Sequence, residues 1–121
     1  MTVQWYKGRR GSTIPKEGCY VRISKLYFQF TDEVWKECFG GLPFLQFGYD
    51  ETENAIYILP HTTRPENLLV FKIGTVTRTH LNQVTWDNFL KEFKLFFEKS
   101  SVVKCVEANG KSRKIVLAKQ Q

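Results

Sequence analysis

Two stretches of the chain open with the same kind of pattern. Residues 21–28 read Val-Arg-Ile-Ser-Lys-Leu-Tyr-Phe, and residues 83–90 read Gln-Val-Thr-Trp-Asp-Asn-Phe-Leu. Each places a β-branched residue before Ser or Thr, and each has an aromatic residue four positions after that hydroxyl. A helix-like stretch and two strand-like runs around a polar turn follow in both cases. A repeat of this kind predicts one small unit that is used twice.

The first unit predicts a strand, a helix and a hairpin. Polar and apolar residues alternate over Tyr20–Lys25, which indicates a strand. Apolar residues at helical spacing follow over Asp32–Phe39, with Thr31 as the candidate N-cap and Gly40-Gly41 as the expected stop. The hairpin strands are expected over residues 44–49 and 55–59.

The second unit predicts a longer helix over Trp86–Glu98, with Thr85 as its N-cap. Asn109-Gly110 is the strongest short hairpin signal in the chain. Strands are expected over residues 69–76, 102–107 and 114–118. Helical spacing predicts that the aromatic residues of both helices, and those just before the first, belong to the core. These are Phe28, Phe30, Trp35, Phe39, Phe89, Phe93, Phe96 and Phe97.

Together these elements predict a single α+β domain over residues 1–121. Two similar β-α-β-β units are expected to form one twisted antiparallel sheet or a small barrel, with two helices packed outside. The expected parts are a basic N-terminal arm (1–18), a first unit (19–60), a linker with two prolines (61–68) and a second unit (69–121).

Positive charge is concentrated at the two ends of the chain. The net charge is +6, and residues 1–30 hold six Lys or Arg against one Glu. Residues 99–121 repeat that ratio, whereas residues 31–98 hold six basic and ten acidic residues. If the ends meet in the fold they form one patch, and nucleic acid is the commonest partner of such a patch. A generic solubilising surface is the alternative.

The candidate contacts therefore lie in the basic end segments. Arginine offers bidentate contacts to phosphate, and aromatic residues beside it can stack on bases. A solvated edge strand and aromatics that seal the core are the alternatives. The predicted phosphate contacts are Lys7, Arg9, Arg10, Lys16, Arg22, Lys25, Arg113 and Lys114, and the candidates for base stacking are Trp5 and Tyr6.

The strand over residues 21–25, the helix from Asp32 and the hairpin over 44–59 together resemble the AbrB-like looped-hinge (swapped-hairpin) DNA-binding domains. The second copy would be residues 84–118. Lys25 and Trp86 stand where that family usually has proline. The resemblance implies two interleaved units in one barrel whose positive face lies on DNA, in preference to RNA. It implies a small transcriptional regulator or a phage or mobile-element accessory factor.

Other classes of function find little support in the residues. His61 and His80 are the two histidines, and neither has a metal or triad spacing, so we expect no enzyme, no metal site and no cofactor. Cys19, Cys38 and Cys105 are expected to be free thiols in a reducing cytoplasm. No run is apolar and long enough to predict a membrane span, and the polar N-terminus does not read as a secretory signal. The alternative function is a protein interaction or assembly module, including a homo-oligomer.

Overall fold

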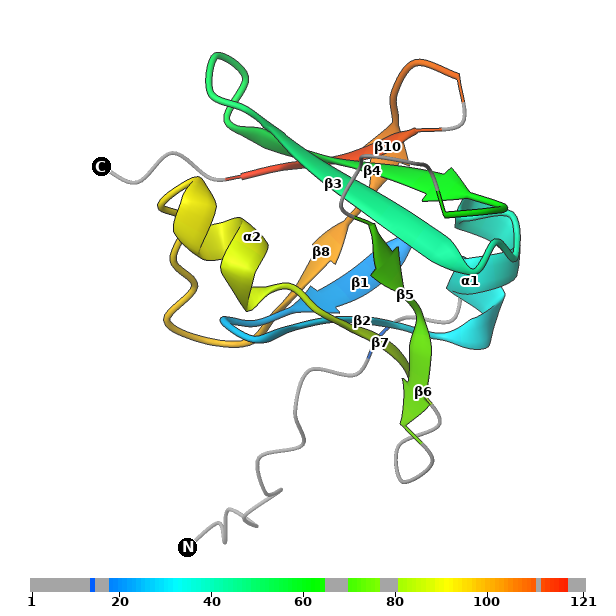
Figure 1. Ribbon diagram of the computed structural model, residues 1–121. Helices are drawn as coiled ribbons and strands as arrows, with labels where there is room; N and C mark the ends of the chain where they lie inside the picture. The colour runs from blue at the N-terminus through cyan, green and yellow to red at the C-terminus, as the bar shows by residue number, and fades with distance from the viewer. Residues whose placement is uncertain (1–13, 15–17, 65–69, 77–80, 111, 118–121) are drawn as a thin grey trace, which may run out of the picture.

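The computed structural model describes residues 14, 18–64, 70–76, 81–110 and 112–117. Within these residues the chain forms ten strands and two short helices (Figure 1). In chain order they are β1 (Tyr20–Ile23), β2 (Tyr27–Phe30), α1 (Asp32–Cys38), β3 (Phe44–Asp50), β4 (Ala55–His61), β5 (Phe71–Lys72), β6 (Gly74–Val76), β7 (Leu81–Thr85), α2 (Asp87–Glu92), β8 (Ser101–Lys104), β9 (Val106–Glu107) and β10 (Arg113–Val116).

The strands form two five-stranded sheets in which the paired neighbours are antiparallel. Sheet A has the order β6-β7-β2-β1-β8, and sheet B has the order β5-β3-β4-β10-β9. The chain passes from one sheet to the other at Ile73, between β5 and β6, and again at Cys105, between β8 and β9. Such corners, where a strand leaves one sheet and enters the next, join two packed sheets at their margins.

The predicted α+β class is therefore wrong: the fold is mostly β, and its strands divide between two sheets. The prediction missed β2, whose Tyr-Phe-Gln-Phe sequence alternates between half-buried and buried residues. It also extended the second helix too far. Figure 1 shows α1 and α2 at opposite ends of the two sheets.

The first helix begins as predicted. The hydroxyl of Thr31 accepts a hydrogen bond from the backbone N–H of Val34 at 3.2 Å, which satisfies one of the donors left open at a helix start. Gly40 and Gly41 both have positive φ values, of 65° and 66°, and turn the chain away from the helix. The N-cap and the stop of this helix are thus confirmed.

The second helix differs from its prediction at both ends. Its N-cap is Trp86, without a side-chain capping bond, because Thr85 still belongs to β7 and pairs with Tyr27. The helix ends at Glu92, and Lys94 takes a left-handed φ of 56°. The chain then leaves the helical path, so Phe96 is 68% exposed instead of buried. The prediction of Phe96 as a core residue is wrong for this reason.

The first half has two strands, a helix and two further strands, and the second half has the same order when β5–β6 and β8–β9 are each taken as one strand that bends, at Ile73 and at Cys105. The corresponding strands lie beside each other: β2 pairs with β7, and β4 pairs with β10, both antiparallel. Ile56 lies directly opposite Ile115 in the second of these pairs. Antiparallel pairing of corresponding strands is the arrangement that an approximate twofold rotation about an axis perpendicular to the sheet produces.

An aromatic core fills the space between the sheets. Phe28 and Trp86 are fully buried, and their ring centroids lie 5.2 Å apart. The Trp86 indole N–H donates to the carbonyl oxygen of Ser24 at 2.8 Å, so this large side chain is buried with its polar atom satisfied. Phe47 from sheet B packs against both rings. The two sheets therefore share one core.

Candidate nucleic-acid interface

The ten predicted contact residues divide into two groups. Six of them fall outside the described residues, namely Trp5, Tyr6, Lys7, Arg9, Arg10 and Lys16. The other four lie on described strands or turns. Arg22 is on β1, Lys25 is in the turn between β1 and β2, and Arg113 and Lys114 are on β10.

Arg22 and Lys25 belong to sheet A. Val21 and Ile23 are buried in the core, so the half-buried Arg22 between them lies on the opposite, outer face of the sheet. Lys25 is exposed in the turn that follows. Arg22 therefore lies on the side of sheet A that faces away from sheet B, and Lys25 lies at the end of strands β1 and β2.

Arg113 and Lys114 belong to sheet B. Ile115 is buried, so its neighbour Lys114 points to the outer face of sheet B. Arg113 turns toward the end of α1, where its Nε donates to the carbonyl oxygen of Cys38 at 3.2 Å. The core separates these residues from Arg22 and Lys25, so the predicted single patch does not form from the four described residues.

The two basic residues of β10 are paired with acidic ones. The Lys114 ammonium lies 2.9 Å from a carboxylate oxygen of Glu53, and Arg113 lies 3.8 Å from Glu107. A hydrogen bond from the Tyr57 hydroxyl, together with Lys114, lowers the pKa of Glu53. The same carboxylate raises the pKa of Lys114. These charges are largely neutralised within the protein.

The strands of sheet A carry a different set of residues. None of β1, β2, β6, β7 and β8 contains Asp or Glu. Strand register places Arg22 beside Val102 and Gln29, and Tyr20 beside Lys104. Gln29 in turn lies opposite Gln83 and donates to it at 2.8 Å. The outer face of sheet A is thus polar, aromatic and basic.

Sequence reasoning missed several residues of this face. Lys104 belongs to the basic end segment but is not among the predicted contacts, and neither are Tyr20, Tyr27 and Gln29. The signal that could have found them is the alternation in Tyr27–Phe30, which marks β2 as a half-buried strand and places Tyr27 and Gln29 on its outer side. If β2 is recognised as a strand, the alternation predicts an outer face of sheet A that has Arg22 near its centre.

The cysteines also differ from their prediction. Cys19 and Cys38 form a disulfide with a Cα–Cα distance of 6.0 Å, so the expectation of three free thiols is wrong. Sequence spacing could not show that the start of β1 meets the end of α1. Cys105 is a buried free thiol, and burial raises its pKa to about 12. Its backbone N–H donates to the carbonyl oxygen of Cys19 at 2.6 Å, at the corner where β8 leaves sheet A.

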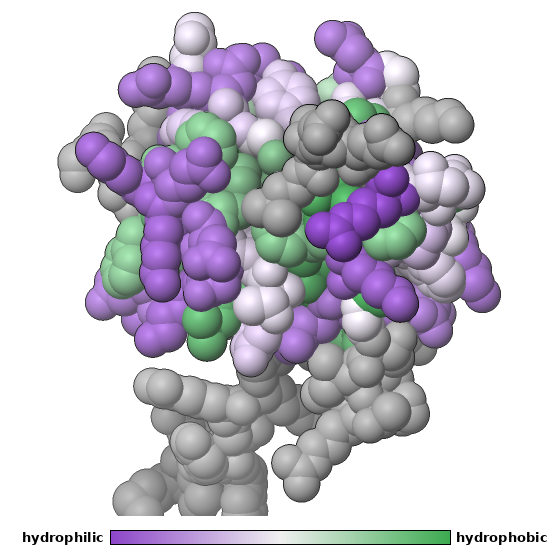
Figure 2. Space-filling view, viewed as in Figure 1, coloured by the Kyte–Doolittle hydropathy of each residue, from purple (hydrophilic) through white to green (hydrophobic). Residues whose placement is uncertain are grey.

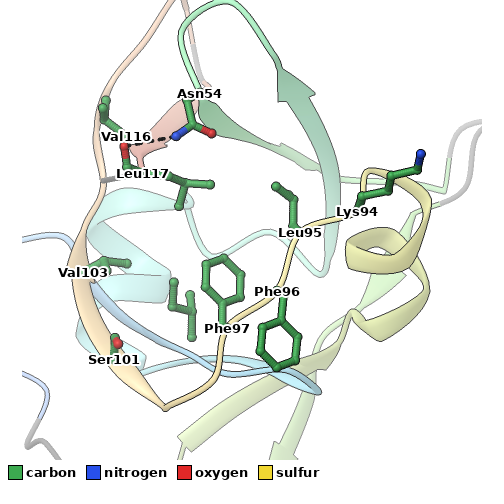
Figure 3. A pocket seen from close by; sticks show the side chains of 10 residues that line it. Asn54, Lys94, Leu95, Phe96, Phe97, Ser101, Val103, Val116 and Leu117 are labelled. Carbon is green, nitrogen blue, oxygen red and sulfur yellow. Dashed lines mark hydrogen bonds between the residues drawn. The ribbon is translucent and has the colours of Figure 1, made fainter. Parts of the chain in front are cut away.

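A cavity of about 460 Å³ opens beside the C-terminal end of α2 (Figure 3). Its wall is mostly apolar, and Leu95 and Phe97 point into it. Asn54 donates to the carbonyl oxygen of Leu117 at 3.4 Å, and Lys94, the one ionisable residue of the wall, points away in Figure 3. The described wall therefore offers apolar contact without a group of convergent ionisable side chains.

Metal ligands and membrane spans can be judged only for the described part of the chain. It contains no group of three or more His, Cys, Asp or Glu side chains suited to a metal ion. No helix in it has both the length and the apolar character that crossing a bilayer demands.

Comparison of the chain with protein-family models, with curated proteins and with solved structures found no match.

Proposed function

We propose that this chain is a nucleic-acid-binding protein whose contact surface is the outer face of sheet A. The observation that carries the proposal is the distribution of charge between the sheets. The exposed Lys25 and Lys104 lie on or beside strands that contain no carboxylate, whereas Arg113 and Lys114 have acidic partners. A polyanion attracted to this protein meets least repulsion at sheet A.

The mechanism is electrostatic anchoring. Basic side chains that contact phosphates release condensed counterions, which drives binding and makes it weaken as salt rises. Lys25 and Lys104 are exposed, so their ammonium groups can contact phosphate oxygens as point charges. The basic segment that precedes β1 in the sequence, with Lys7, Arg9, Arg10 and Lys16, adds to the positive charge available at this end of the chain.

The resemblance to looped-hinge DNA-binding domains supports the same class of ligand and makes DNA the first polymer to test. Within that class, a small transcriptional regulator or an accessory factor of a phage or mobile element is the corresponding role. Arg113 and Lys114 on sheet B are excluded from the proposed contact surface, because they already bind Glu107 and Glu53.

Fluorescence anisotropy with labelled DNA oligonucleotides tests the proposal. We expect the logarithm of the affinity to fall linearly as the logarithm of the salt concentration rises. Removing two charges from sheet A (Lys25→Gln with Lys104→Gln) should weaken binding and reduce the slope by about one for each phosphate that the variant no longer neutralises. Binding that is absent at low salt, or that does not respond to salt, contradicts the proposal.

The matched control removes two charges from sheet B. The Arg113→Gln and Lys114→Gln double variant changes the net charge by the same amount, so a nonspecific effect of net charge alters both double variants equally. We expect the sheet B variant to retain most of its affinity. Equal losses in the two variants would mean that total charge, not the face of sheet A, determines binding.

An interaction module is the second candidate, and one observation favours it. Phe96 is 68% exposed and Val116 is 58% exposed, and both line the apolar cavity. Figure 2 shows hydrophobic side chains over α2 among hydrophilic ones. A protein partner, including a second copy of the chain, would cover them. Sedimentation that shows an oligomer, converted to a monomer by Phe96→Ser, supports this candidate, and a wild-type monomer counts against self-association.

A further inference from the structure

The shape of the outer face of sheet A bears on the kind of nucleic acid that it binds. Proteins that read duplex DNA usually insert a helix into the major groove, and that helix needs neutral or positive side chains near the phosphates. In α1, Asp32, Glu33 and Glu37 outnumber Lys36. In α2, Asp87 and Glu92 outnumber Lys91. Neither described helix is suited to a groove of a polyanion.

The basic residues lie instead on a sheet, together with two aromatic rings. Tyr20 and Tyr27 are half-buried, and both alternate with buried core residues, so they share the outer face with Arg22. The pairing of Arg22 with Gln29 sets the offset between β1 and β2. It separates the two tyrosines by about 14 Å, from four residues along the strands and one strand across. Each ring can therefore meet a different base, with Arg22 between them.

The position of the Tyr20 ring is constrained by its surroundings. Gly18 has a φ of +83°, and a Cβ atom added there would lie 2.9 Å from Cε2 of Tyr20. The ring thus rests against the backbone at the start of β1, in space that only glycine leaves open. A ring held in place before the ligand arrives loses less conformational freedom on binding.

Polar groups for base edges lie on the same face. Gln29 donates through Nε2 to Oε1 of Gln83 at 2.8 Å. This bond leaves the carbonyl oxygen of Gln29 and the amide hydrogens of Gln83 as an acceptor and a donor beside Arg22. Paired bases in a duplex turn their edges toward each other, whereas unpaired bases offer both faces and edges to a protein.

We propose that sheet A binds single-stranded nucleic acid, with Tyr20 and Tyr27 stacking on two bases while Lys25 and Lys104 contact the phosphates. This inference depends on the proposed function and makes it more specific. The contact is made between unpaired bases and the outer face of sheet A. The inference also assigns roles to two tyrosines that charge alone would not select.

The test compares three labelled probes of equal length: oligo(dT), oligo(U) and a DNA duplex. Loss of stacking costs about fivefold to a hundredfold in affinity for each base. We therefore expect Tyr20→Leu and Tyr27→Leu each to weaken binding of the single strands by about that factor. Tyr27→Phe keeps the ring and should retain binding, which separates stacking from a change in fold. Tyr57→Leu, on the outer face of sheet B, is the matched control and should leave affinity unchanged.

The outcomes separate this inference from the proposed function. Duplex bound as tightly as oligo(dT), with no response to the tyrosine variants, overturns the single-strand inference and leaves nucleic-acid binding intact. Absence of binding to every probe at low salt overturns both. Preference for oligo(U) over oligo(dT) supports stacking on single strands and assigns the natural ligand to RNA instead of DNA.

Discussion

The two sheets of this protein are alike in size and pairing but differ in how their basic and acidic residues are arranged. Sheet B places Lys114 beside Glu53 and Arg113 beside Glu107, so its basic groups support the fold. Sheet A has the exposed Lys104 on strands that contain no acidic residue. A net charge of +6 therefore says little about a partner until each charge is assigned to a face.

The largest expected effect concerns the core that both sheets share. Phe89 is 6% exposed and packs near Phe47 and Trp86, so Phe89→Ala should lower the free energy of unfolding by about 3–5 kcal/mol. Phe96 belongs to the same predicted helical face but is exposed. Phe96→Ala should therefore change the free energy of unfolding by less than about 0.5 kcal/mol. Urea denaturation measures both, and equal losses would contradict the early end of α2.

The disulfide ties the start of sheet A to the end of α1. It closes a loop with a sequence separation of 19, so reduction should lower the free energy of unfolding by about 2–4 kcal/mol. Denaturant titrations with and without a reductant measure this loss. Cys105→Ser should show the same dependence on reductant, since Cys105 takes no part in the bond. Alkylation of three thiols in unreduced, unfolded protein would contradict the pairing.

A smaller effect should distinguish a structural arginine from a surface lysine. Arg113 donates to the carbonyl oxygen of Cys38, so Arg113→Ala should lower the free energy of unfolding by about 1–3 kcal/mol. Lys25 is exposed in the β1–β2 turn, and Lys25→Ala should leave stability within about 0.5 kcal/mol of the wild type. Thermal denaturation of the two variants tests this difference. A greater loss of stability for Lys25→Ala than for Arg113→Ala would contradict the structural role of Arg113.

The smallest effect is the dependence of sheet B on pH. The pKa of Glu53 is lowered from its ordinary value of 4.5, so its bonds to Tyr57 and Lys114 stabilise the fold above pH 4.5, and this stabilisation disappears as the pH falls through the lowered pKa. The pKa of Lys114 is raised from its ordinary value of 10.5. Its contribution to stability is therefore complete below pH 10.5 and is lost as the pH rises through the raised pKa. Melting temperatures of wild type and Glu53→Gln should converge in acid, and a constant gap would contradict the pairing.

The sequence predicted local features that depend on neighbouring residues. Three predicted features follow from local chemistry and are present in the structure. They are the hairpin strands β3 and β4, the Thr31 cap and the turn at Asn109-Gly110. The end of α2 could not be predicted, because Lys94 adopts a left-handed φ that sequence signals reserve for glycine. The disulfide depends on contact between elements 19 residues apart.

The candidate site was predicted only in part, for a related reason. Arg22 and Lys25 follow from an alternating strand that carries basic residues. The separation of Arg22 from Arg113 and Lys114 depends on which sheet each strand joins, and the sequence does not state this. Lys104 joins the face only because β8 pairs with β1 across some eighty residues of chain, at the register that sets Lys104 beside Tyr20.

The most direct test of the account is a titration of the isotope-labelled protein with oligo(dT), followed through its backbone amide chemical shifts. We predict that the shifts which change with saturation lie on β1, β2 and β8, with the largest changes around Tyr20, Arg22 and Tyr27. The amide chemical shifts of β4 and β10 should not change. Changes confined to β4 and β10, or the absence of any saturable change, would contradict the assignment of the contact surface to sheet A.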